Sequence, residues 1–81
     1  MPKLRRLSGK QVVKVFEKFG FDIVAQKGSH IKLRRVVSST VYQTITISNH
    51  SELDRGTSKA IFNQALRYIP DQELRKEFYT K

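Results

Sequence analysis

The spacing of the apolar residues changes twice along this chain, and this restricts the fold more than any other feature. Apolar residues recur at helical spacing from Val12 to Phe19, alternate with polar residues in segments between 21 and 47, and return to helical spacing from Ile61 to Ile69. A period of 3.6 residues gives a helix one buried face, and a period of 2 gives a strand one buried face. The pattern predicts an α+β fold.

The first helix is expected over about residues 9–19. Ser8 with Gln11 three residues later has the pattern of a capping box, and Gly20 can end the helix with a left-handed residue. The lysines fall on the side away from the apolar face, where a solvated stripe is the plainer interpretation. These lysines are Lys10, Lys14 and Lys18.

Three short strands are expected next, at about residues 21–26, 30–34 and 41–47. The turn residues Lys27-Gly28-Ser29 separate the first two, and Ser38-Ser39-Thr40 precedes the third, which is rich in β-branched residues. Connections this short join antiparallel neighbours. The segments therefore predict a three-stranded antiparallel sheet.

Two further helices complete the predicted order. A helix over about 58–69 would be capped by Thr57 and bury Ile61, Ala65, Leu66 and Ile69. A short helix over 71–79 pairs Leu74 with Phe78 but is otherwise charged, so we expect it to be an exposed appendage.

The predicted architecture is one domain over residues 1–81, with a core region at 8–69 and a helical extension at 70–81. The order is α-β-β-β-α plus a terminal helix, with helices on one face of the sheet and the other face open. The expected core residues are Val12, Phe16, Phe19, Ile31, Leu33, Ile61, Leu66 and Ile69.

The charge is strongly basic and unevenly distributed. Sixteen Lys and Arg residues against seven carboxylates give a net charge of +9, and residues 1–35 hold ten of the cations but two of the carboxylates. A cationic surface on the N-terminal half follows. No segment has the ~18 apolar residues of a membrane span, so we expect no membrane association and a cytoplasmic location.

Several chemistries lack the residues that they need. The chain has no cysteine and two histidines, and it has no phosphate-binding loop or dinucleotide motif, so we expect no metal and no nucleotide cofactor. The carboxylates are scattered and suit helix ends or solvated faces, so no paired-carboxylate hydrolase is indicated.

His30 is the candidate catalytic residue. It follows the Gly28-Ser29 turn and opens a strand in which His30, Lys32 and Arg34 share one face. Imidazole exchanges protons near neutral pH, and cations hold phosphates, so the row could cleave RNA through activation of its own 2′-hydroxyl. A surface histidine on a merely basic strand is the plainer alternative, and the spacing alone gives that alternative more weight.

Two other segments could contact a phosphate. His50 lies in the loop after the third strand, where capping a turn is its simpler role. Gly56-Thr57-Ser58-Lys59 combines backbone N–H groups at a helix start with a cation, although any capped helix start offers the N–H groups.

Two separated motifs resemble the HicA family of toxin mRNA interferases. They are Lys27 to Arg34, and Asp54 to Ala65, with a β-branched strand ending near His50 between them. The resemblance covers about residues 8–69. The resemblance implies a double-stranded-RNA-binding-like fold, ribonuclease activity that depends on His30, and a HicB-type antitoxin that covers the site. It also implies that Gly28 and Ser29 shape the turn of that histidine.

Three functions fit these patterns. The first is an mRNA-cleaving toxin in which Lys27, Lys32 and Arg34 hold the backbone and His30 is the general acid or base. The second is a non-catalytic RNA-binding module of the same fold. The third is an interaction protein whose basic face binds an acidic partner. The RNA-contacting residues expected are Lys27, Gly28, Ser29, Lys32, Arg34, His50 and Lys59.

Overall fold

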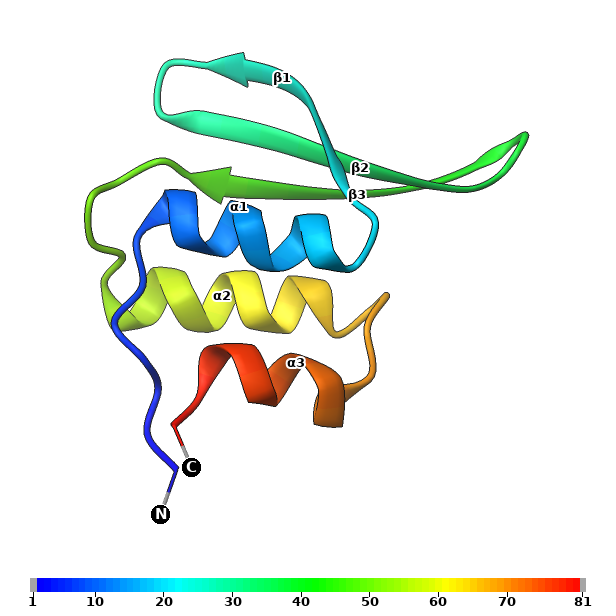
Figure 1. Cartoon of the computed structure of the whole chain (residues 1–81). Coiled ribbons are helices and arrows are strands. Elements are labelled where there is room, and N and C mark those ends of the chain that lie inside the picture. The colour runs from blue at the N-terminus through cyan, green and yellow to red at the C-terminus, as the bar shows by residue number, and fades with distance from the viewer. Residues whose placement is uncertain (1, 81) are drawn as a thin grey trace.

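The computed structural model describes residues 2–80 and has the order α1, β1, β2, β3, α2, α3 (Figure 1). The predicted α+β architecture is confirmed, with the helices layered below one face of an open three-stranded sheet. The elements are α1 (Gly9–Lys18), β1 (Asp22–Lys27), β2 (His30–Ser38), β3 (Val41–Ser48), α2 (Arg55–Ala65) and α3 (Asp71–Phe78).

The start of α1 forms as the sequence predicts. The Ser8 hydroxyl accepts a hydrogen bond from the Gln11 amide at 3.1 Å, and the Gln11 side chain accepts one from the Ser8 amide at 2.8 Å. Gly9 follows at the first helical position, where an added Cβ would overlap the Ser48 carbonyl oxygen and lie 2.7 Å from Asn49 Cα. The end of β3 therefore packs directly on the start of α1.

The sheet has the strand order β1-β2-β3, and both pairs are antiparallel. On β2 and β3, Ile31, Leu33, Ile45 and Ile47 are buried against the helices, while the residues between them are exposed or half-buried. The structure confirms the register predicted for β2. β1 is exposed along its whole length and contains a bulge between Ile23 and Ala25, so its alternation is broken.

The core contains most of the residues predicted for it. Val12, Phe16, Ile31, Leu33, Ile61 and Ile69 are all buried. The prediction is wrong for Leu66, which is 38% exposed, and Phe19 is half-buried at the edge of the core. Leu66 is exposed because α2 ends at Ala65, and Phe62 provides the bulky side chain on the buried face.

The predicted bounds of the second helix are also wrong. α2 begins at Arg55, with Asp54 rather than Thr57 as its N-cap, and it ends four residues before Ile69. The first turn, Arg55-Gly56-Thr57, is polar and carries no apolar periodicity, so the pattern does not reveal it. Ile69 reaches the core from the turn that follows the helix.

The extension, which the structure describes over residues 70–80, packs on α1 and α2 as a third layer rather than as an exposed appendage. Leu74 and Phe78 of α3 are fully buried, and the Phe78 ring lies 5.5 Å from the Phe62 ring and 6.0 Å from the Phe16 ring between centroids. The N-terminal segment pairs with the end of α3, with a bridge between Leu4 and Tyr79. The expectation was wrong because the Leu74 and Phe78 pair, although flanked by charged residues, is enough to bury this face of α3 against the core.

Candidate functional site

His30 is the first residue of β2 and is exposed on the open face of the sheet. It pairs with Lys27 on β1 and with Ser48 on β3. The buried side chains of Ile31 and Leu33 point toward the helices, so His30, Lys32 and Arg34 point the other way. The structure therefore places these three predicted site residues in one exposed row.

A row of hydroxyl groups lies beside this basic row. Ser48, Thr46 and Thr44 of β3 pair directly with His30, Lys32 and Arg34 of β2. Directly paired residues of antiparallel strands share a face, with their Cβ atoms about 5 Å apart. The open face therefore presents cations and hydroxyl donors side by side, which are the groups that bind phosphate and sugar oxygens.

Tyr42 extends the same face toward the far end of the hairpin. Its ring is 53% exposed, and the Arg34 guanidinium lies over it at 4.9 Å from the ring centroid. An exposed aromatic ring beside cations can stack on a base. The sequence analysis did not identify Tyr42 or the hydroxyl row, although the period-2 pattern of β3 places all of them on the open face.

The Gly28-Ser29 turn connects β1 to β2 and sets the position of His30. Gly28 has φ +58°, and Ser29 has a negative φ, which is the pattern of a type II′ hairpin turn. The Ser29 carbonyl accepts a hydrogen bond from the Asn49 amide at 2.6 Å. The turn is thereby attached to the segment that follows β3.

His50 lies in that segment, directly after Asn49, and is therefore near the turn that precedes His30. Its side chain is exposed, and its carbonyl accepts a hydrogen bond from the Gly9 amide at 2.9 Å. The backbone of His50 thus helps to hold α1 against the sheet, while its imidazole remains accessible.

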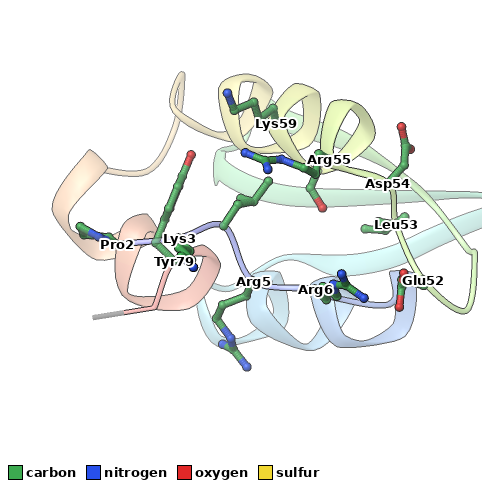
Figure 2. A pocket seen from close by; sticks show the side chains of 12 residues that line it. Pro2, Lys3, Arg5, Arg6, Glu52, Leu53, Asp54, Arg55, Lys59 and Tyr79 are labelled. Carbon is green, nitrogen blue, oxygen red and sulfur yellow. The ribbon is translucent and has the colours of Figure 1, made fainter.

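Lys59 is not part of the row on the sheet. It lies on α2 and lines a pocket of about 690 Å³ between the N-terminal segment, α2 and Tyr79 (Figure 2). Arg6 and Arg55 line the same pocket, and the sequence analysis did not identify them as site residues. Only the three-dimensional contact between residues 2–6 and α2 brings these cations together.

The charges on the sheet face are not neutralised within the described chain. The ion pairs among residues 2–80 join Lys18 to Glu77, Arg75 to Asp71, and Lys76 to Glu73. None of them includes Lys27, Lys32 or Arg34. The row therefore presents its full positive charge to an anionic ligand.

At the start of α2 the carboxylate of Asp54 lies among polar groups of the first turn. The Thr57 hydroxyl, followed by the backbone amides of this turn, lowers the pKa of Asp54 below its ordinary value. The carboxylate is exposed and makes no cap hydrogen bond, so its pKa is lowered by the nearby dipoles at the positive end of the helix.

Among residues 2–80, no group of three His, Asp or Glu side chains is placed to hold a metal ion. No helix in this part of the chain is long and apolar enough to cross a membrane.

These observations define a small α+β protein with a basic face on its sheet and a histidine at the end of the central strand. The family described as the HicA toxin of bacterial toxin–antitoxin systems matches residues 9–66, and the chain belongs to this family. The resemblance seen in the two sequence motifs is thereby confirmed. The protein is the toxin of a toxin–antitoxin pair, and a cognate antitoxin is implied as its partner. No curated protein and no solved structure shows significant similarity to the chain.

Proposed function

We propose that this toxin is an endoribonuclease that cleaves mRNA, with His30 as its general acid or base. The observation that best supports the proposal is the exposed row of His30, Lys32 and Arg34 beside the hydroxyl row of β3. Cations and hydroxyl groups would hold the phosphodiester while the imidazole moves a proton. Lys27 and the Gly28-Ser29 turn would hold the backbone at the end of the row.

The proposed reaction uses the 2′-hydroxyl of the RNA as the nucleophile. The His30 imidazole takes the proton of the 2′-hydroxyl, the 2′-oxygen attacks the adjacent phosphorus, and the bond from phosphorus to the 5′-oxygen breaks. The departing 5′-oxygen takes a proton from the imidazolium. The products are a 2′,3′-cyclic phosphate and a 5′-hydroxyl, so the step requires no added cofactor.

The antitoxin is proposed to be a HicB-like protein that covers this face. An acidic surface would pair with the exposed cations of β2. Expression of the toxin alone should then arrest growth, and expression of the antitoxin with it should restore growth.

The His30→Ala variant tests the catalytic proposal. General acid–base catalysis by one group supplies about 10²–10⁴-fold, so cleavage should fall by that factor, while RNA affinity and the unfolding midpoint should stay near the wild-type values. Cleavage of a defined mRNA in EDTA, with analysis of the 3′ ends of the products, measures the effect. The matched control is His50→Ala, which replaces the other histidine and should keep the cleavage chemistry.

Two results would contradict the proposal. The first is full cleavage by purified His30→Ala protein. The second is a wild-type protein that binds RNA and never cuts it, which would favour the non-catalytic RNA-binding module. A substrate with 2′-deoxyribose at the cut site should resist cleavage, because it lacks the nucleophile.

A further inference from the structure

The pocket of about 690 Å³ lies away from the open sheet face, and its walls are strongly basic (Figure 2). Lys3, Arg5 and Arg6 come from the N-terminal segment, and Arg55 and Lys59 come from α2. Residues 2–6 and Tyr79 lie outside the segment that matches the HicA family. The pocket is therefore built in part from chain outside the matched segment.

Most of these cations are available to a ligand. Arg5 donates a hydrogen bond to the Glu77 carbonyl oxygen at 2.9 Å and is occupied. Arg6, Arg55 and Lys59 take part in none of the ion pairs found among residues 2–80. Figure 2 shows the Arg55 guanidinium close below Lys59, on the side of the pocket that faces Tyr79.

The two acidic residues on the wall do not cancel this charge. Asp54 and Glu52 are outnumbered by the five cations, and the Thr57 hydroxyl and amide attract the Asp54 carboxylate toward the first turn of α2. Figure 2 shows Asp54 pointing away from Arg55 and Lys59. The interior of the pocket therefore keeps a positive potential.

Ser58 provides a second, independent indication of a ligand. It lines the pocket from α2, is 1% exposed, and its hydroxyl has no hydrogen-bond partner within the described chain. Buried hydroxyl groups nearly always have a partner, so an unpaired one requires an explanation. The hydroxyl oxygen is shielded from solvent, so an acceptor oxygen between Arg55 and Lys59 would become its partner once the Ser58 side chain rotates toward the pocket.

The pocket and the histidine row are joined by one short segment. The Asn49 amide bonds the Ser29 carbonyl at the His30 turn, and the Leu53 amide bonds the Leu7 carbonyl beside the pocket. The β1–β2 turn and the starts of α1 and α2 all lie at the same end of the molecule (Figure 1). One extended RNA strand could therefore pass from the His30 row to the basic pocket.

We propose that this pocket binds a backbone phosphate of the same RNA, in the part of the strand that flanks the nucleotides held at His30. The inference rests on the proposed function, because it takes RNA as the ligand. Arg55 and Lys59 neutralise the phosphate, and the Ser58 hydroxyl donates to one of its oxygens. The site raises the affinity for RNAs that are long enough to reach it, and it takes no part in the cleavage chemistry.

A salt titration of RNA affinity tests the charged part of the proposal. In a His30→Ala background, which suppresses cleavage, Arg55→Gln with Lys59→Gln should reduce the slope of log affinity against log salt by about 0.7 for a 12-nucleotide RNA, because the pocket holds one phosphate of a single strand. A trinucleotide, too short to reach the pocket, should bind equally to both proteins. The matched control is Arg67→Gln with Lys76→Gln, which removes the same charge from the turn after α2 and from α3.

Ser58→Ala tests the uncharged part. The affinity for the 12-nucleotide RNA should fall about three- to tenfold, the value of one hydrogen bond. The midpoint of urea unfolding should not fall, because the variant removes a buried hydroxyl that has no partner in the free protein. A general loss of folding would lower both quantities, so the two readouts separate a ligand contact from a structural role.

The outcomes separate this inference from the proposed function. If the parent protein binds no RNA at any salt concentration, the proposed function fails. If it binds RNA and the pocket variants keep the parent salt slope and affinity, only the pocket assignment is overturned. Loss of antitoxin binding with unchanged RNA binding would assign the pocket to an acidic protein and would also overturn the inference.

Discussion

Two adjacent arginines on β2 lie on opposite faces of the sheet and make different contacts. The sequence alone does not distinguish them. Arg34 is exposed on the open face. Arg35 points to the other side, where it donates to the Gln43 side chain at 2.8 Å, the Phe19 carbonyl at 2.8 Å and the Tyr68 carbonyl at 3.0 Å. Its guanidinium also lies over the Phe21 ring at 4.9 Å. Arg35 thus connects the ends of α1 and α2 to the sheet.

Replacement of Arg35 by Lys should therefore destabilise the fold. A lysine lacks the planar guanidinium that donates in three directions, so at least one carbonyl would lose its partner. We expect the free energy of unfolding to fall by about 2–3 kcal/mol. Arg34→Lys is the matched control and should change the free energy of unfolding by less than ~0.5 kcal/mol. Urea unfolding of both variants measures the difference. Equal stabilities would show that the Arg35 hydrogen bonds contribute nothing to the fold.

At the level of single elements, the strands were easier to predict than the second helix. A strand with one buried face needs strict alternation, and His30 to Arg34 shows it, so the register of the proposed site follows from the sequence. The start of α2 depends on polar residues around Asp54, whose role is set by dipoles and not by apolar spacing. The pocket beside it depends on contacts between distant segments, which no local pattern contains.

The start of α2 should make stability depend on pH in the acidic range. The folded-state pKa of Asp54 lies below its ordinary value, chiefly because of the Thr57 hydroxyl. The unfolded chain therefore binds this proton first as the pH falls. The stabilisation of the fold by ionised Asp54 is complete above the ordinary pKa of the carboxyl group. It is lost as the pH falls through the lower pKa of the folded state.

Asp54→Asn should remove this contribution while keeping a residue suited to the N-cap. The free energy of unfolding, measured in urea between pH 6 and pH 3, should fall less steeply with acid in this variant than in the wild type. Asp22→Asn is the control, because Asp22 lies on β1, away from any helix start. An acid dependence identical to that of the wild type would contradict the role assigned to Asp54.

For the whole molecule, α3 and the N-terminal segment close the side of the helix layer that faces away from the sheet. The Arg5 amide bonds the Phe78 carbonyl at 2.8 Å, the Thr80 amide bonds the Lys3 carbonyl at 2.8 Å, and Lys18 pairs with Glu77 at 3.0 Å. This layer leaves the open sheet face and its projecting β2–β3 hairpin as the accessible surfaces of the sheet (Figure 1). Under the proposed function, RNA and the antitoxin should compete for this one face.

Phe78→Ala should show that α3 belongs to the folding unit. The ring is fully buried between Phe16 and Phe62, so its removal leaves a cavity and should cost about 3–5 kcal/mol, a large share of the ~5–15 kcal/mol that stabilises a typical domain. Lys76→Ala is the matched control on the same helix. It breaks only an exposed ion pair with Glu73, worth less than ~1 kcal/mol.

Urea unfolding followed both by far-ultraviolet circular dichroism and by tyrosine fluorescence should give one shared transition for each protein, shifted strongly only in Phe78→Ala. A loss no larger than that of the control would mean that α3 is an appendage after all, and the N-terminal wall of the basic pocket would then lack its support.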